Sequence, residues 1–332
     1  MHTSPEHPAR TIGVTGSSGF LASVIGPLAQ ARGHRLVAFT RRPGAKPAWA
    51  AEDRRFAADE TPDLSGLDAV IHLAGESVAG LWTAEKRRRI RESRLATTRR
   101  VAEAIAQRPD HPCALVCASG VGYYGDRGDD ELTEESACGS GFLAEVVAGW
   151  EREAGAAAAA GARVACLRLG VVLGREGGML PLLARAFRLG LGGKLGSGRQ
   201  WMSWIHAADA ARLFLAAAED PAWSGPVNAV APAPLTNADF TRLLAHALRR
   251  PAWLHTPAFL LRLPPLPSEL FLASQRALPR AAEARGFAFG YPHLADALAD
   301  LTGVTPSTGA GPGAGCPGDP DGPAQTPGPQ TR

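Results

Sequence analysis

The stretch Arg10-Thr-Ile-Gly-Val-Thr-Gly-Ser-Ser-Gly-Phe-Leu-Ala22 decides the fold of this chain. Residues 10–15 form a short apolar run typical of a buried strand, and a turn containing Gly16 and Gly19 follows without a break. Residues 20–32 then repeat apolar side chains at helical spacing, and a glycine ends the pattern. A strand, a tight glycine turn and a helix in direct succession predict the start of a parallel α/β sheet.

Short apolar runs alternate with helical patterns further along the chain. Strands are expected at 34–40, 67–74, 114–119 and 162–169, and helices at 83–107 and 141–160. Strands that alternate with helices pair in parallel, and helices cover both faces of the sheet. The pattern therefore predicts a Rossmann-type, doubly wound parallel sheet over residues 11–175.

The pattern changes after residue 175. Glycine-rich loops surround expected helices at 180–189, 207–219, 236–249 and 269–300, and one strand near 226–230 is expected to return to the sheet. These features predict a smaller, mostly helical C-terminal substrate subdomain over residues 176–301. Residues 1–10 are expected to form a flexible leader, and the Gly/Pro-rich residues 302–332 a disordered tail.

Composition argues against several classes of function. The net charge of the 332 residues is only +3, so neither nucleic acid nor a membrane is expected as a partner. No apolar run reaches the roughly 20 residues that span a bilayer, and the N-terminus does not resemble a signal peptide. The 5 cysteines include no CxxC pair, which favours a cytoplasmic location. His206 and Asp209 alone are too few ligands for a metal site, so no metal is expected.

The glycine turn has the chemistry of a pyrophosphate site. Gly16 permits the tight turn, Gly19 permits close approach of a phosphate, and Ala22 allows the helix to pack closely on the strand. The N–H groups at the start of the helix then face the anion. This pattern predicts dinucleotide contacts from Gly16, Ser17, Ser18, Gly19, Phe20 and Leu21. The alternative is a surface turn that only caps a helix.

The end of the second strand indicates which dinucleotide is bound. NAD-binding proteins usually place Asp or Glu there to accept a hydrogen bond from the ribose 2′-hydroxyl. Here the position is Thr40, and Arg41 and Arg42 follow it. Two guanidinium groups without a carboxylate suit a 2′-phosphate, which predicts NADP(H). The alternative is that both arginines are solvated loop charges.

Several motifs together resemble the extended short-chain dehydrogenase/reductases, which include nucleotide-sugar epimerases and dehydratases. These motifs are TGSSGFLA at 15–22, DAVIHLAG at 68–75, SGVGYYG at 119–125 and RLGVVLG at 168–174. The phrases IHLAGE, GYYGD, FRLGLGGKLGSGRQ, WIHAAD, SQRALP and GFAF resemble one subgroup, the epimerase family proteins of subfamily 39U. The resemblance extends from about Thr11 to Leu301.

The resemblance implies further site residues. Cofactor contacts are implied for Thr40, Arg41, Leu73, Ala74, Gly75 and Val172, and for Arg89 and Arg94 of the basic helix. For residues 87–91 a solvated basic face is the simpler interpretation. The resemblance also implies a small-molecule substrate, and relatives often form homodimers through two helices of the cofactor domain.

The sequence departs from the wider family at the catalytic centre. The usual chemistry requires Tyr-x-x-x-Lys on one helix, where the Lys lowers the pKa of the phenol. Here those positions hold Phe142 and Val146 or, one residue later, Leu143 and Val147. Ser119, Tyr123 and Tyr124 are the candidate catalytic substitutes. Each of them also has a structural interpretation, as a residue that satisfies local backbone or packs over a glycine loop.

Candidate substrate contacts lie nearer the C-terminus. Arg168 is implied by the resemblance, and the stretch GSGRQWMSWIHAAD adds Gln200, Trp204 and His206 as groups that stack on or hydrogen-bond a ligand. The alternative for Trp204 is a core position. Two functions remain open: an NADP(H)-dependent oxidoreductase or epimerase, and a non-catalytic NADP(H)-binding protein that senses redox state or regulates a partner.

Overall fold

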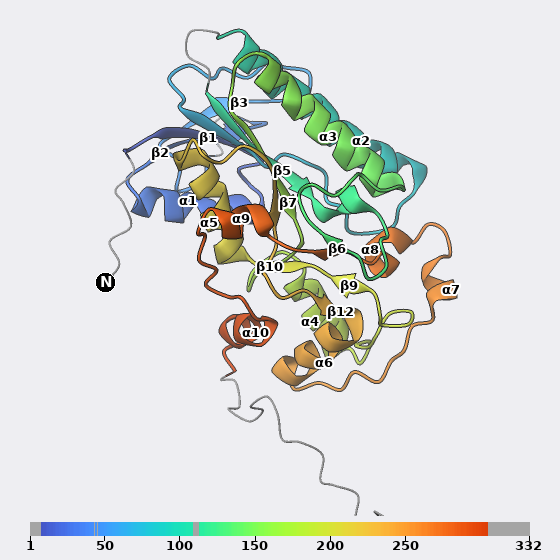
Figure 1. The fold of residues 1–332 in the computed structure, drawn as a ribbon. Helices are drawn as coiled ribbons and strands as arrows, with labels where there is room; N and C mark the ends of the chain where they lie inside the picture. Colours follow the sequence, from blue (N-terminus) through green and yellow to red (C-terminus); the bar gives the residue numbers. More distant parts are fainter. Residues whose placement is uncertain (1–7, 43, 45, 109–112, 305–332) are drawn as a thin grey trace, which may run out of the picture.

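A seven-stranded parallel sheet forms the centre of the molecule (Figure 1). The computed structural model describes residues 8–42, 44, 46–108 and 113–304. The strand order is β11-β7-β5-β4-β1-β2-β3, so the order reverses between β1 and β4, where doubly wound sheets bind ligands. The strands are β1 (Thr11–Thr15), β2 (Arg35–Thr40), β3 (Glu52–Arg55), β4 (Ala69–His72), β5 (Ala114–Gly120), β7 (Val164–Leu169) and β11 (Gly225–Ala229).

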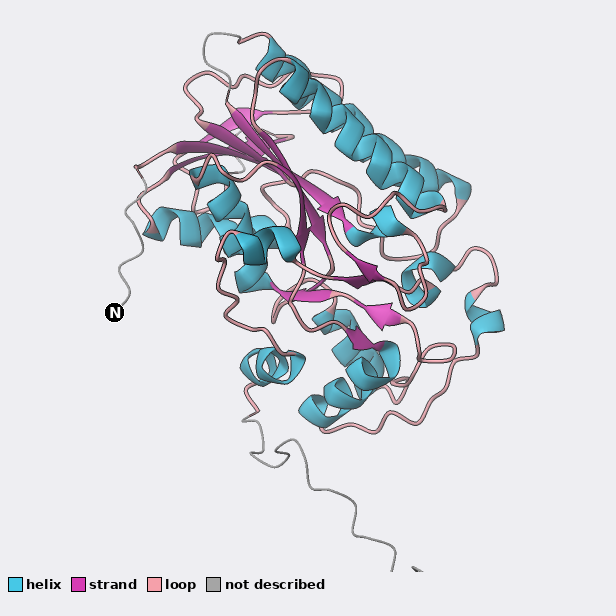
Figure 2. Cartoon of the chain, in the orientation of Figure 1, coloured by secondary structure: helices cyan, strands magenta, loops and turns pink. Residues whose placement is uncertain are grey.

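Helices cover both faces of this sheet, as Figure 2 shows. The long helices α2 (Ala84–Ala106) and α3 (Phe142–Ala159) pack side by side on one face. On the other face α1 (Phe20–Ala31) packs against α5 (Ala207–Glu219), whose residues are mostly buried. A helix that is apolar all round belongs inside the protein, which explains the alanine-rich sequence of α5. The predicted Rossmann-type fold is confirmed.

Most of the C-terminal part packs beyond the carboxyl edge of the sheet, whereas residues 280–284 pack against β11. Its helices are α4 (Leu180–Arg188), α6 (Asn237–Leu248), α7 (Ala258–Leu261), α8 (Ser268–Leu272), α9 (Arg280–Ala284) and α10 (Leu294–Thr302). Short strands join these elements: β6 (Glu131–Leu132), β8 (Val171–Leu173), β9 (Trp201–Met202), β10 (Trp204–His206), β12 (Leu235–Thr236) and β13 (Arg276–Ala277). The single turn η1 (Val121–Tyr124) follows β5. The tail expected from residue 302 lies outside the described residues from 305 onward.

Two expectations about local structure were wrong. Residues 269–300 do not form one helical stretch, because Pro279, Gly286, Gly290 and Pro292 interrupt them and 276–277 pair with β6 instead. The strand β3 was not expected, because its sequence Glu-Asp-Arg-Arg is entirely charged. It forms at the sheet edge, where it pairs with β2 alone and its side chains reach solvent.

The described residues contain no helix with the length and apolar character that a bilayer crossing needs. Cys113, Cys117, Cys138 and Cys166 are free thiols, and burial raises the pKa of the first of them to about 11. Cys316 lies outside the described residues.

Candidate functional site

The glycine turn between β1 and α1 leaves a cradle at the carboxyl edge of the sheet. Gly16 has φ +65°, and a Cβ atom there would lie 2.9 Å from the backbone carbonyl of Leu73, so only glycine fits. Gly19 donates its N–H to the Gly16 carbonyl at 2.8 Å and forms the N-cap of α1 without any side-chain cap. The first N–H groups of α1 therefore have no side-chain acceptor among the described residues, and they suit an anion.

The side chains around this turn have structural roles. The buried Ser17 hydroxyl donates to the Phe39 carbonyl at 2.9 Å and ties the turn to β2, while Ser18 is exposed. Phe20 turns its ring onto the glycine loop 174–178, and Leu21 packs against the core. These residues would therefore contact a bound phosphate through backbone groups.

The end of β2 presents cations to solvent. Arg41 and Arg42 are exposed, and neither has an ion-pair partner within the described part of the chain. Asp53, on the neighbouring strand β3, accepts the Gly44 N–H at 2.7 Å and lies 3.4 Å from the Thr40 hydroxyl. Asp53 thus fixes the loop after β2. Sequence reasoning missed this residue because it missed the strand.

The loop after β4 is anchored through a buried histidine. The Thr15 hydroxyl accepts the N–H groups of Leu73 and Ala74 at 3.1 and 3.3 Å and lies 2.8 Å from His72 Nδ1. On the other side of the ring, Nε2 lies 3.0 Å from the Thr98 hydroxyl. Burial lowers the pKa of His72 to about 3, so this ring is neutral at physiological pH.

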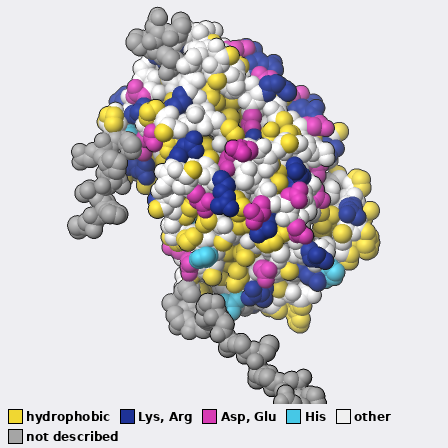
Figure 3. Space-filling view, in the orientation of Figure 1, with side chains coloured by type: hydrophobic (Ala, Val, Ile, Leu, Met, Phe, Trp, Pro, Cys, Tyr) yellow, Lys and Arg dark blue, Asp and Glu magenta, His cyan; other side chains and the backbone are white. Residues whose placement is uncertain are grey.

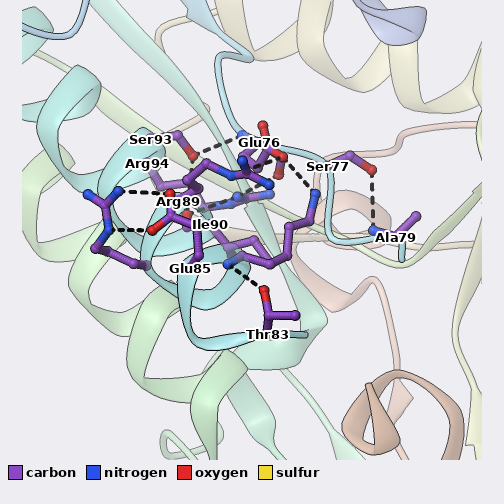
Figure 4. A network of polar contacts seen from close by, with 11 residues as sticks. Glu76, Ser77, Ala79, Thr83, Glu85, Arg89, Ile90, Ser93 and Arg94 are labelled. Atoms are coloured by element: carbon purple, nitrogen blue, oxygen red, sulfur yellow. Dashed lines mark hydrogen bonds and ion pairs between the residues drawn. The ribbon is translucent and has the colours of Figure 1, made fainter. Parts of the chain in front are cut away.

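A cation cluster anchors the same loop to α2 (Figure 4). Glu76 Oε1 lies 2.6 Å from Lys86 Nζ and 3.9 Å from Arg89 Nε. The hydrogen bond from Lys86 lowers the pKa of Glu76. Arg94 donates through Nη1 to the carbonyls of Glu76 and Ile90 at 2.9 and 3.1 Å. The expected cofactor residues Arg89 and Arg94 therefore hold the loop, and Glu76 is their partner.

Arg94 also reaches toward the cradle. Its guanidinium lies 5.0 Å from the Trp150 ring, and a Cβ atom on Gly75 would come 3.3 Å from Arg94 Cζ. Burial lowers the pKa of Arg94 to about 10, so the group stays cationic at neutral pH. Its Nη1 makes both hydrogen bonds, and its Nε and Nη2 have no hydrogen-bond partner among the described residues.

A polar network lies at the ends of β5 and β7. The Ser119 hydroxyl donates to Glu151 Oε1 at 2.6 Å. Arg168 grips the same carboxylate with two hydrogen bonds of 2.8 Å, from Nε and Nη2. The Tyr123 ring lies 3.6 Å from the Arg168 guanidinium and is half-buried. Glu151 was not among the expected site residues. It follows Val147 by four residues on the same helix, so helical spacing places it on the same face, and this was the available signal.

The structure places the candidate catalytic residue Tyr124 inside the protein. Its side chain is fully buried, its hydroxyl donates to Asn228 Oδ1 at 2.7 Å, and it accepts from Arg168 Nη1 at 2.9 Å. Burial raises the pKa of Tyr124, which further opposes proton transfer at neutral pH. The hydroxyl therefore uses both its donor and its acceptor capacity within the protein.

The expected substrate contacts are also internal. Arg168 is 3% exposed and bound to Glu151, and Trp204 is a core residue whose indole donates to the Ala233 carbonyl. Gln200 is buried and donates to the carbonyls of Leu195 and Phe271. His206 caps α5 by accepting the Ala208 N–H and stacks on Tyr291, and burial lowers its pKa. In the described structure these four side chains contact the protein itself, and His206 Nε2 is buried without a hydrogen-bond partner. Their role in substrate binding stays a prediction.

The start of α3 lies beside this network. A Cβ atom on Gly122 would come 3.1 Å from Leu143 Cβ, and one on Gly120 would come 4.0 Å from Val147 Cγ2. Leu143 and Val147 therefore face the end of β5 and η1. The N–H groups of Phe142 and Leu143 donate to the carboxylate of Glu269 on α8, at 3.0 and 2.9 Å. Val172, on β8, pairs with Ile205 of β10.

This arrangement defines the class of Rossmann-type nucleotide-binding proteins, with the anion cradle at the switch point of the sheet. The family model "NAD dependent epimerase/dehydratase family" matches residues 12–229, and a domain of unknown function, DUF1731, matches residues 256–301. The chain belongs to the NAD-dependent epimerase/dehydratase family and, within it, to the epimerase family proteins.

Individual relatives cover nearly the whole fold. Epimerase family protein YfhF of Bacillus subtilis is 36% identical over 299 residues, which are 87% of this chain and 97% of that protein. The crystal structure of human epimerase family protein SDR39U1 with NADPH is similar with a TM-score of 0.78 at 34% identity, covering 89% of this chain and 100% of that one. A nucleoside-diphosphate sugar epimerase from Corynebacterium glutamicum has a TM-score of 0.71 at 37% identity, and the alignment covers 89% of this chain but only 59% of that longer protein.

Proposed function

We propose that this chain binds NADP(H) and acts as an epimerase/dehydratase-like oxidoreductase on a small molecule in the cytoplasm. The observation that carries the proposal is the cradle at Gly16 and Gly19, followed at the end of β2 by Arg41 and Arg42. The cradle matches a pyrophosphate, because backbone N–H groups and the dipole of α1 converge there. The exposed guanidinium groups match a 2′-phosphate. The NADPH bound to the human relative supports this choice.

The carboxylate of Asp53 does not oppose this assignment. A carboxylate that selects NAD must accept from the ribose 2′-hydroxyl. Asp53 instead accepts from the Gly44 backbone, and this contact holds the loop that presents the arginines. Free thiols on four buried or exposed cysteines agree with a reducing compartment.

The NADP(H) preference is tested by titrating the protein with NADPH and NADH. We expect NADPH to bind at least about tenfold more tightly, equivalent to about 1.4 kcal/mol. Arg41→Ala is expected to remove most of this ratio, while Arg35→Ala, an exposed arginine at the other end of β2, leaves it unchanged. An Arg41→Ala protein with an undiminished ratio would disprove the assignment of the 2′-phosphate site.

A proton route is available from this chain's own residues. NADP(H), when bound, supplies or accepts the hydride. Ser119 accepts a hydrogen bond from a substrate hydroxyl while its own proton is directed to Glu151 at 2.6 Å. The bidentate contact with Arg168 keeps that carboxylate in place. In this proposal Ser119 and Glu151 take the role of the Tyr and Lys pair, and Tyr123 packs beneath Arg168 as a positioning residue.

One observation favours a second candidate function, a non-catalytic NADP(H)-binding protein that senses redox state or regulates a partner. Leu143 and Val147 face the end of β5, where the wider family places its acid/base pair, and neither can exchange a proton. The two functions are separated by following NADPH absorbance against carbonyl compounds and nucleotide sugars. Turnover that Ser119→Ala abolishes without weakening NADPH binding supports the enzyme, whereas tight binding without turnover on the whole panel supports the sensor.

A further inference from the structure

Exposed hydrophobic side chains are concentrated on one part of the C-terminal region. Ten large hydrophobic residues are exposed within the described ranges, and six of them follow one another in the chain around α7. These six are Trp253, Leu254, Phe259, Leu260, Leu263 and Leu266, with Trp253 79% exposed and Phe259 65% exposed. Such a concentration exceeds the scattered single exposures of an ordinary surface and marks an interaction site.

The other four exposed hydrophobic residues lie next to this segment. Leu182, Leu189 and Leu191 belong to α4 and the loop after it. That loop runs beside 254–256, because the N–H of Leu254 donates to the Gly192 carbonyl. Leu81 is adjacent as well, since the next residue donates its N–H to the Pro265 carbonyl. We call the exposed surface of residues 182–199 and 242–266 the α4–α7 face; Figure 3 shows hydrophobic side chains gathered at the edge where Figure 1 places α7.

The α4–α7 face is also cationic. Residues 177–208 and 240–268 contain no Asp or Glu. The first stretch exposes Arg185, Arg188, Lys194 and Arg199, and the second exposes Arg242, Arg249, Arg250 and Arg262. Of these cations only Arg242 has an ion pair in the described structure, with Asp239.

Helix α2 shows the opposite arrangement of charge. Most of its basic residues have carboxylate partners, for example Arg88 with Glu85 and Glu92, and Arg99 with Glu153. The low net charge of the chain therefore hides a difference between two regions: the charges of α2 are largely neutralised by carboxylates, and those of the α4–α7 face are not. The expectation that a membrane is not a partner rested on that average, which does not describe the charge of this face.

We propose that the α4–α7 face docks onto the surface of an anionic phospholipid bilayer. Aromatic and leucine side chains beside lysine and arginine are the composition of segments that lie in the membrane interface. Trp253 and Phe259 insert at the level of the headgroups, and the surrounding cations meet lipid phosphates. A hollow lined by Lys194, Arg242, Trp253 and His255 lies within the face.

The charges argue against two other occupants. A symmetric contact with a second copy would bring these unpaired cations against each other, which is unfavourable. Nucleic acid would satisfy the cations but would leave the leucine side chains without apolar partners, because phosphate and sugar contacts dominate such interfaces. The bilayer surface satisfies both properties at once.

The test is sedimentation of the full-length protein with vesicles. Phosphatidylcholine vesicles that contain about 30% phosphatidylglycerol are compared with pure phosphatidylcholine at about 0.1 M salt, where the Debye length is still about 10 Å. We expect at least tenfold tighter binding to the anionic vesicles, and further weakening as salt is raised. Arg249→Gln/Arg250→Gln is expected to weaken binding about tenfold. The matched control is Arg91→Gln/Arg152→Gln, which removes two exposed charges from α2 and α3.

Apolar insertion has its own readout. Trp253→Phe keeps an aromatic anchor and should still sediment, but it should lose the blue shift of tryptophan emission that vesicles cause in the unaltered protein. Phe259→Ser/Leu260→Ser should reduce sedimentation without changing the melting temperature. Equal binding to both kinds of vesicle, or equal loss in the control variant, overturns the proposal. Light scattering that shows a dimer dissociated by Trp253→Ser would also overturn it and would assign the face to a second copy.

Discussion

Glu151→Gln is the substitution that tests the network at the ends of β5 and β7 most directly. It keeps the size of the side chain and removes one charge from a buried ion pair. The side chain of Arg168 is 4% exposed and that of Glu151 is 16% exposed. In the substituted protein, one amide oxygen has to serve Ser119 and Arg168 together. The guanidinium then remains inside the protein without a neutralising charge.

The expected cost follows from this burial. Removing one partner of a buried ion pair destabilises a protein by about 3–5 kcal/mol, because the remaining charge is uncompensated. Some hydrogen bonding to the amide oxygen survives, so we expect about 3 kcal/mol, at the lower end of that range. For a chain of this size that loss lowers the melting temperature by roughly 4–5 °C.

The assay is urea unfolding of the protein, Glu151→Gln, Arg168→Met and the double variant. The double variant buries no charge, so it should be more stable than the sum of the two single losses predicts. Ser119→Ala, which removes one hydrogen bond and no charge, should cost only about 1 kcal/mol. If Glu151→Gln costs less than about 1 kcal/mol, as an exposed ion pair would, the network is not a buried charge pair and the reasoning is refuted.

Three further predictions concern the cradle and its supports. Gly16→Ala should destabilise the protein by more than the roughly 1–2 kcal/mol that a left-handed alanine costs, and it should abolish NADPH binding. The control is Gly33→Ala, at φ +81° with open space around it, which should show the backbone cost alone. Equal losses of stability in the two variants would exclude the close approach of residue 16 to Leu73. Glu269→Gln should lower stability by about 1 kcal/mol in thermal unfolding by weakening the cap of α3, and a larger effect from the exposed Glu145→Gln would contradict this. In the unfolded chain His72 is protonated below its ordinary pKa, whereas in the folded protein it stays neutral down to about pH 3. The free energy of unfolding should therefore fall as pH falls from 6.5, and in urea unfolding His72→Gln should reduce that slope by up to about 1.4 kcal/mol per pH unit. An unchanged slope would show that this ring is not the source.

The sequence was most informative where one local rule acts alone. The strand, turn and helix from Thr11 to Ala31 follow from apolar periodicity and from glycine at a position where the backbone is left-handed. The edge strand β3 could not be predicted, because its charged residues form a strand only through pairing with β2. The broken stretch after residue 269 was predicted as helical because its helical spacing hid the effect of prolines and glycines on the backbone.

The candidate site was harder to predict for a different physical reason. Residues that follow parallel strands in the sequence can be expected to meet at the same edge of the sheet, and Ser119, Tyr123 and Arg168 do meet there. It does not indicate whether a polar group is free for a ligand or already satisfied by the protein. Tyr124 and Trp204 are satisfied internally, and their partners come from residues distant in sequence.

The cap that α8 places on α3 has a consequence for motion. Glu269 accepts the first N–H groups of that helix, and the chain a few residues earlier accepts the Trp82 N–H through Pro265. The C-terminal region is thereby tied to the nucleotide-binding half at two points. An outward movement of the α7–α8 segment would break both Glu269 contacts and leave the first N–H groups of α3 uncapped, so such a movement would be coupled to fraying at the start of the helix that carries Leu143.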